Sequence, residues 1–205
     1  MSAHPGVPLL VDAVAKLGFR ERSELLFTRD FASYEGWLGF NTATRRGTTG
    51  EMLIHPIVGV RYGDVEEWVA RVGNKKLRPY SPPTFSEPLR YLVPIENRQD
   101  WVLNGGPSDS SAVADFSWAL DAHGLRFMED MGDLRLVAAK LGKNAANDQN
   151  AAYRWPVALL LTGQTDDALR AVRTVRSTLE GRGDDAAEEL RKYLMRLEAD
   201  IRSQF

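Results

Sequence analysis

The three histidines are the side chains of this 205-residue sequence whose charge changes most readily near neutral pH. His4 lies beside the amino terminus, His55 in an alternating apolar stretch, and His123 directly before Gly124. No two of them have the spacing of a metal-binding pair, and no HExxH motif is present. At the end of a predicted helix, His123 is best placed to compensate the helix dipole. The sequence therefore assigns no metal site and no catalytic histidine.

Acidic residues cluster at two places where a helix is expected to begin. Asp64, Glu66 and Glu67 form the first cluster, and the second lies within residues 184–189. Acid–base or metal chemistry would need further oxygen atoms to converge on these carboxylates. In a first helical turn, carboxylates already serve to cap free amides and to complement the helix dipole. We therefore interpret both clusters as helix starts, with Asp64 as the N-cap of the first helix.

Other catalytic signatures are missing from the sequence. It has no cysteine, which excludes disulfides, thiolate metal sites and cysteine nucleophiles. The serines near residue 110 belong to no GxSxG or SxxK pattern. The glycines at 47–50 lack the lysine of a phosphate-binding loop, and those at 105–106 lack the dinucleotide-binding pattern. No catalytic residue, metal or cofactor is therefore predicted.

A row of arginines is the first candidate for binding a partner. Arg170, Arg173 and Arg176 recur every three residues on a predicted helix, where they could hold an acidic protein or phosphates. The same row is also typical of a solvated helix face, because Asp166 is spaced to pair with Arg170. Both interpretations stay open at the level of sequence.

A short basic cluster beside a proline-rich stretch is the second candidate. Loops held by rigid elements often carry binding residues, and this stretch has lysine, arginine and tyrosine close together. Trp37 lies on a predicted strand, and its neighbours on the same face of that strand are small or polar, so it is also a candidate contact. These partner-binding candidates are Trp37, Lys75, Lys76, Arg78 and Tyr80.

Length and charge limit the classes of function. A chain of 205 residues allows one large domain or two small ones. Its 26 basic and 28 acidic residues give a formal net charge of -2, which argues against nucleic-acid binding by bulk charge. No stretch reaches the roughly 18 apolar residues of a membrane span, and the amino terminus lacks the pattern of a secretory leader. We therefore expect a cytoplasmic protein.

The first half of the chain has mixed periodicity. Apolar residues spaced by three and four predict helices, and strict alternation predicts strands. By these patterns we expect a helix at 9–17, strands at 25–31, 36–45 and 52–62, and a helix at 64–72. A loop should follow at 74–88, and then two short strands at 89–95 and 101–103.

Almost everything after residue 105 has the spacing of helices. The expected helices cover residues 108–124, 125–131, 133–142, 151–161, 165–179 and 184–201. The fold class is therefore α+β: an antiparallel sheet of three to five strands flanked by helices, followed by an all-helical part. We predict a sheet domain at 1–105 and a helical region at 106–205. Within that region, 106–142 should pack on the sheet domain, and 150–205 should form a hairpin-like extension.

Three segments carry a resemblance to a known family. Residues 17–20 (LGFR), 27–31 (FTRDF) and 36–40 (GWLGF) look like the opening of a bacterial family of small domains of unknown function. In that family a helix ending in such a turn leads into an antiparallel meander, and residues 124–141 are similar to its helical tail. The resemblance covers about residues 9–141. Some relatives lie near toxin genes and are suspected immunity proteins, and the family provides no catalytic residues.

A second resemblance covers the C-terminal helices. Residues 158–169 (ALLLTGQTDDAL) look like the middle of a tetratricopeptide unit, a helical hairpin that binds proteins. Only one unit is visible, and arrays usually need about three for stability. The resemblance therefore implies one docked helical hairpin.

These observations favour a non-enzymatic module that binds another protein, immunity-like neutralisation of a toxin being one form of it. The alternative is an enzyme or small-ligand binder whose site is assembled from scattered residues such as His55, Arg61 and Glu67. A third hypothesis is nucleic-acid binding through the helix of Arg170, which the balanced charge disfavours. A homo-oligomer is left open.

Overall fold

The structure is a computed structural model that describes residues 4–44, 50–77 and 82–204. Two compact units are present, and each is made of two separate segments of chain. The sheet unit comprises Met1–Arg61 and Ser86–Gly132, and the helical unit comprises Tyr62–Phe85 and Asp133–Phe205. The predicted division into residues 1–105 and 106–205 stays a prediction.

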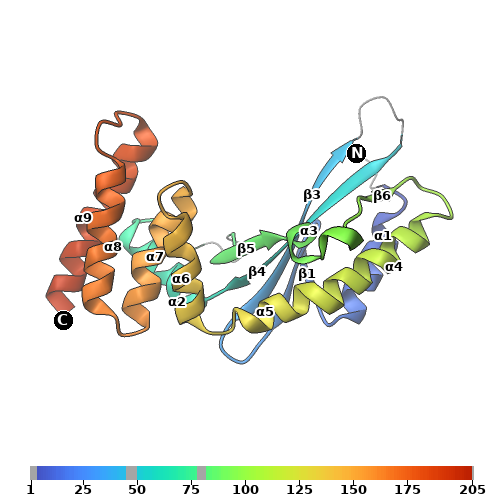
Figure 1. Ribbon diagram of the computed structural model, residues 1–205, viewed down its shortest axis with the longest axis horizontal. Coiled ribbons are helices and arrows are strands. Elements are labelled where there is room, and N and C mark those ends of the chain that lie inside the picture. Colours follow the sequence, from blue (N-terminus) through green and yellow to red (C-terminus); the bar gives the residue numbers. More distant parts are fainter. Residues whose placement is uncertain (1–3, 45–49, 78–81, 205) are drawn as a thin grey trace. The chain divides into compact units, whose positions relative to one another are not determined.

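An antiparallel sheet is the centre of the sheet unit (Figure 1). Its strands are β1 (Arg20–Ser23), β2 (Leu26–Asp30), β3 (Glu35–Thr44), β4 (Met52–Arg61), β5 (Phe85–Pro88) and β6 (Trp101–Leu103). The order across the sheet is β1-β2-β3-β4-β5, and β6 pairs with β4. This confirms the predicted α+β class with its antiparallel sheet and helical C-terminal part.

The long hairpin of β3 and β4 sets which side chains face the core. Its register runs from Glu35 opposite Arg61 to Thr44 opposite Met52. Alternate side chains therefore share a face, and Leu38 and Val58 are fully buried on one of them. The aromatic ring of Phe40 meets that of Phe116 on this face, with centroids 5.4 Å apart.

Helices cover that apolar face of the sheet. They are α1 (Val7–Lys16), α3 (Leu89–Leu92), α4 (Asp109–Ala119), the π-helical turn η2 (Leu120–Leu125) and α5 (Arg126–Asp130). The π-helical turn corrects one prediction, because Gly124 does not end a helix: the chain stays helical through it. Gly124 is buried, and a Cβ there would overlap the Leu120 side chain.

The predicted strand at 89–95 is wrong. Residues 89–92 form α3, and Ile95–Asn97 form the 3-10 turn η1. Leu89 and Val93 are both buried, and the Val93 amide donates to the Leu89 carbonyl. A spacing of four between two buried apolar residues is helical, while Pro88 and Pro94 keep the helix to one turn.

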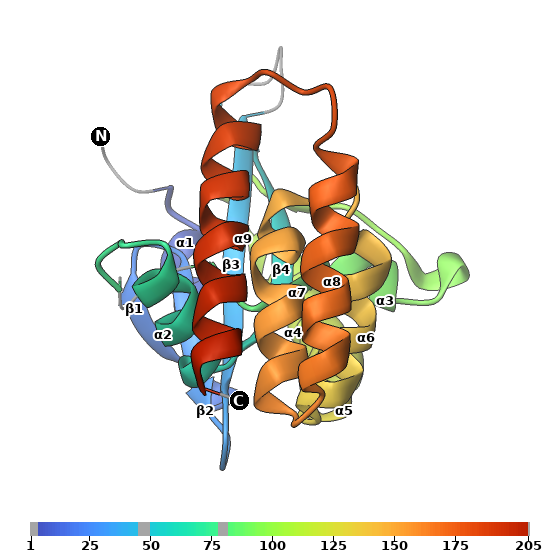
Figure 2. The same cartoon turned by 90° about the vertical axis from the view of Figure 1, so that its left-hand side faces the viewer.

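The helical unit contains five helices among the residues described. They are α2 (Gly63–Val72), α6 (Leu134–Asn144), α7 (Gln149–Leu161), α8 (Thr165–Thr178) and α9 (Asp185–Gln204). Figure 2 shows α8 beside α9, and α7 packs against α6 and α8. No helix in the described ranges is long and apolar enough to cross a membrane.

Helix α2 joins these C-terminal helices by packing on α7 and α9. Val65 and Val72 are buried in this contact. The start of α2 differs from the prediction, because the helix begins at Gly63 and Asp64 makes no side-chain cap. Its place in the first turn leaves Asp64 to complement the helix dipole only.

Candidate functional site

A cleft of about 670 Å³ lies within the helical unit. Its walls are α2, the residues that follow α2, and the facing sides of α7 and α9. The volume is that of a typical ligand pocket in a protein. The lining residues are Glu66, Val69, Ala70, Gly73, Lys75, Lys76, Leu77, Pro82, Asn150, Tyr153, Arg154, Glu189, Tyr193 and Arg196.

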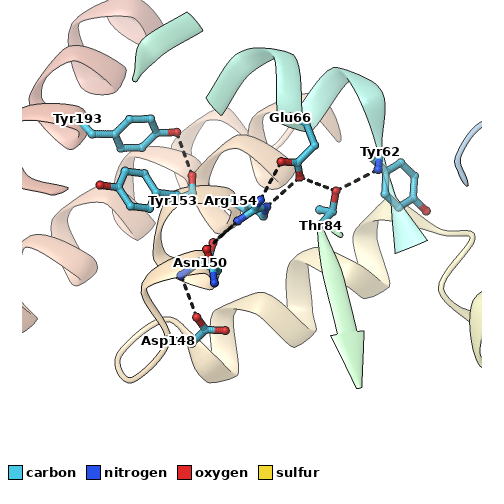
Figure 3. Close-up of polar contacts among 8 residues, drawn as sticks. All are labelled: Tyr62, Glu66, Thr84, Asp148, Asn150, Tyr153, Arg154 and Tyr193. Atoms are coloured by element: carbon cyan, nitrogen blue, oxygen red, sulfur yellow. Dashed lines mark hydrogen bonds and ion pairs between the residues drawn. The ribbon is translucent and has the colours of Figure 1, made fainter. Parts of the chain in front are cut away.

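Two residues of the cleft lining, Glu66 of α2 and Arg154 of α7, form a buried ion pair (Figure 3). Two parallel hydrogen bonds join them, Nε to Oε1 and Nη2 to Oε2, each 2.8 Å long. The side chains are only 4 % and 5 % exposed, respectively. This two-pronged geometry is the strong form of an arginine–carboxylate contact.

Further hydrogen bonds complete the ion pair. The Thr84 hydroxyl donates to Glu66 Oε1 at 2.8 Å and accepts from the Tyr62 amide at 3.0 Å. Arg154 Nη1 donates to the Asn150 carbonyl at 3.3 Å. Each oxygen of Glu66 therefore accepts at least one hydrogen bond. The pair joins α2 to α7.

Two tyrosines form the aromatic side of the cleft. The Tyr193 hydroxyl donates to the Tyr153 carbonyl at 2.9 Å, and the two rings meet edge to face with centroids 4.6 Å apart. Burial raises the pKa of Tyr193 far above its ordinary value, and burial is also the largest cause that raises the pKa of Tyr153. Both phenols are therefore neutral near pH 7.

The Tyr153 hydroxyl is buried without a hydrogen-bond partner among the described residues. The side chain of Gln149 lies near enough to lower the pKa of Tyr153 slightly, but the contact does not meet hydrogen-bond geometry. A buried polar group with no partner is unusual in a folded protein. The cleft thus has an unsatisfied phenol in its wall.

An exposed ion pair lies at the mouth of the cleft. Lys75 Nζ is 2.5 Å from Glu189 Oε1 and 5.9 Å from the centre of the Tyr153 ring. The hydrogen bond with Glu189 raises the pKa of Lys75, and the same bond lowers the pKa of Glu189. The side chains are 61 % and 51 % exposed, so the pair contributes only about 0–1 kcal/mol to stability.

The lining has more positive charge than negative. It contains four cations against the two carboxylates of Glu66 and Glu189, which pair with Arg154 and Lys75. The other cations are Lys76 and Arg196, and neither forms an ion pair with any residue that the structure describes. The cleft is therefore suited to hold a negatively charged group.

Several side-chain types that are common in catalytic sites do not occur in the described lining. Within the described part of the chain, it has no histidine, serine or cysteine, and its carboxylates are paired. No group of three or more potential metal ligands occurs among the residues described.

The structure places the predicted contact residues in different regions. Lys75 and Lys76 line the cleft. Arg78 and Tyr80 lie outside the described residues. Trp37 of β3 is half-buried and lies flat across Gly39, where a Cβ would overlap its ring.

The arginine row of α8 is exposed and lies away from the cleft. Arg170 pairs with Asp167, not with the Asp166 expected from the sequence, and Arg176 pairs with Glu198 at 3.0 Å. Arg173 donates to the backbone carbonyl of Leu169 at 3.3 Å. These contacts match the solvated face that the sequence left open.

The residues of the alternative hypothesis belong to both units, His55 and Arg61 to the sheet unit and Glu67 to the helical unit, and that hypothesis stays a prediction. His55 and Arg61 lie on the same strand, six residues or about 20 Å apart at the rise of a strand, and Glu67 is an exposed residue of the other unit. Arg61 pairs with Glu35 at 2.8 Å. His55 lines a separate groove of about 520 Å³ in the sheet unit.

Sequence reasoning missed the central residues of the cleft. Glu66 was interpreted as one acid of a helix start, and Arg154, Tyr153, Tyr193 and Arg196 were not singled out. A usable signal was present for Glu66, because it lies three residues before the apolar Val69 and so on the same side of the predicted helix. Nothing in the sequence connects it with a residue 88 positions away.

No protein-family model matches the chain, and no curated protein or solved structure matches it either. The resemblances to the bacterial domain family and to a tetratricopeptide unit therefore stay predictions.

Proposed function

We propose that this protein is a non-enzymatic protein-binding module, and that it holds a segment of its partner in the cleft of the helical unit. The observation that carries the proposal is the cleft itself, an opening of about 670 Å³ whose carboxylates are already paired with cations. A ligand placed there would meet no unpaired carboxylate among the described lining residues, whereas two of the lining cations form no ion pair.

The surroundings of the cleft support binding of a protein chain. Most of its lining residues belong to the packed helices α2, α7 and α9, which hold a binding surface rigidly and so reduce the entropy lost on binding. Leu77 presents an apolar side chain in the lining that is 37 % exposed. The partner is another protein in the cytoplasm, and a toxin neutralised by this protein would be one partner of this kind.

Photo-crosslinking in the native host tests this proposal. A photoreactive amino acid replaces Leu77 in the cleft, and in a matched control it replaces Leu136, an apolar residue of α6 that is 49 % exposed and does not line the cleft. We expect a discrete crosslinked protein with the probe at residue 77 that is absent with the probe at residue 136. The same products from both positions, or none from residue 77, would contradict the proposal.

A further inference from the structure

The two cations that remain unpaired in the cleft indicate what kind of segment it would accept. From their position we infer that the cleft binds an acidic, extended peptide segment, in which carboxylates pair with Lys76 and Arg196 and an apolar side chain packs beside Leu77. This inference rests on the proposed function and specifies the chemistry of the partner.

Helix α9 provides one unpaired cation of the cleft lining, Arg196. Arg196 lies three residues after Tyr193 and seven after Glu189, a spacing that puts all three side chains on one side of a helix. Glu189 cannot neutralise Arg196 fully, because it already accepts the Lys75 ammonium at 2.5 Å. A carboxylate from outside would therefore find a free guanidinium at this wall.

The opposite wall provides the second cation. Lys76 follows Lys75 directly in the chain, but it forms no ion pair or hydrogen bond with any residue that the structure describes. Carboxylates held by arginine and lysine form charge-assisted hydrogen bonds, which are about twice as strong as neutral ones. Two cations on separate walls suit a segment with more than one acidic side chain.

Apolar surface lies between the charged groups. Val69, Ala70, Leu77 and Pro82 line the cleft with the two cations. A small inorganic anion would leave this surface exposed, whereas a peptide with an apolar residue beside its acids would cover it. The combination favours a peptide over a free anion.

The positive charge is local to the cleft. The whole chain has a formal net charge of -2, so it does not attract acidic molecules through its overall charge. Selectivity for an acidic segment would come from the unpaired cations within the cleft, and the ionic strength of the solution would weaken it.

The test compares three fluorescein-labelled ten-residue peptides with the same apolar residues. One has Glu and Asp at the remaining positions, one has Gln and Asn, and one has Lys. Fluorescence anisotropy gives the Kd of each for the full chain. We expect the acidic peptide to bind at least tenfold more tightly than the neutral one, and the basic peptide to bind most weakly.

Charge reversal in the cleft then locates the site. The variant K76E/R196E should weaken binding of the acidic peptide at least tenfold, because both cations that pair with it are lost. The matched control R135E/K140E makes the same change of net charge at two exposed residues of α6 outside the cleft, and it should bind like the wild type. Circular dichroism checks that both variants are folded.

Three results would overturn the inference. If the neutral peptide bound as tightly as the acidic one, the cleft would bind the apolar residues of the peptide and not its carboxylates. Equal loss of binding in both variants would place the charge effect outside the cleft. Displacement of the acidic peptide by inorganic phosphate, free glutamate or a single-stranded oligonucleotide at the same concentration of charge would assign the site to another anion.

The inference and the proposed function can fail separately. If no peptide binds but photo-crosslinking at residue 77 still captures a partner, the acidic chemistry is wrong and the protein-binding function stands. If no peptide binds and photo-crosslinking at residue 77 captures no specific protein, both the inference and the proposed function are wrong.

Discussion

Each unit buries a carboxylate, and the two are satisfied in opposite ways. In the sheet unit, Asp109 accepts the backbone amides of Asn104 at 2.8 Å and Gly105 at 3.1 Å, all within one turn of chain. In the helical unit, Glu66 depends on the side chain of Arg154, 88 residues further on. A local partner forms with the turn itself, whereas a distant charged partner forms only when the tertiary structure does.

The largest expected effect comes from removing the distant partner. Arg154→Met should lower the free energy of unfolding of the helical unit by about 3–5 kcal/mol, because it leaves Glu66 charged and buried without a counterion. Urea unfolding followed by circular dichroism measures the loss. The double variant E66M/R154M removes both charges and should recover most of it. A loss below about 1 kcal/mol in the single variant would mean that water replaces Arg154.

Removing the locally satisfied carboxylate should have a smaller effect. Asp109→Ala deletes two charge-assisted hydrogen bonds and should cost about 2–3 kcal/mol in the sheet unit. Asp109→Asn keeps one acceptor oxygen and should lose less. If Asp109→Ala destabilised the protein more than Arg154→Met in the same urea titration, the contrast between the two carboxylates would be wrong.

Tyr193 offers an intermediate case, a buried polar group with one neutral hydrogen bond. Tyr193→Phe should cost about 1 kcal/mol at pH 7, because the Tyr153 carbonyl loses its donor. Because phenylalanine keeps the aromatic ring, the packing against Tyr153 is unchanged, and the loss of stability reports on the hydroxyl alone.

The same variant has a characteristic pH dependence. Burial raises the pKa of Tyr193 in the folded state far above the ordinary tyrosine value of about 10. Its contribution to stability is therefore complete below pH 10 and is lost as the pH rises above 10, by about 1 kcal/mol at pH 10.5. Unfolding at pH 8 and pH 10.5 should show this extra loss in the wild type and not in Tyr193→Phe.

The smallest effect is expected at the mouth of the cleft. Lys75→Met removes an ion pair that is mostly exposed, and it should change stability by less than about 1 kcal/mol. The pKa of Glu189 is lowered by Lys75, so this small contribution is present above the ordinary pKa of a glutamate and is lost in acid. If Lys75→Met lowered the free energy of unfolding as much as Arg154→Met does, the exposure of an ion pair would not explain how much it stabilises this protein.

The regular elements were predictable because they depend on nearby residues. Alternation indicated the β3–β4 hairpin, and apolar spacing indicated α6 to α9. The prediction was wrong at 89–95, where one helical turn between two prolines has too few residues to show a period. The buried place of Gly124 was also missed, because the sequence does not show that Leu120 and Leu89 pack against this glycine.

The candidate site could be predicted only in part, for the same reason. Lys75 and Lys76 were found because a basic cluster beside a proline-rich loop is visible in the sequence. Glu66 and Arg154 were not found, because a buried ion pair depends on which helices pack together. Within its own helix, each of these two residues is ordinary.

Because each unit is made of two separate segments of chain, the ribosome completes the two units one after the other. Residues 62–85 are an insertion in the sheet unit. In the sequence they separate β4 from β5, but these two strands are neighbours in the sheet. At a synthesis rate of about 5–20 residues per second, Arg154 follows Glu66, 88 residues earlier, by about 4–18 s. The sheet unit can fold as soon as its last helix has left the ribosome. At that time the valines and the carboxylate of α2 are still exposed. Proteases and chaperones would therefore meet this helix before its own partners do.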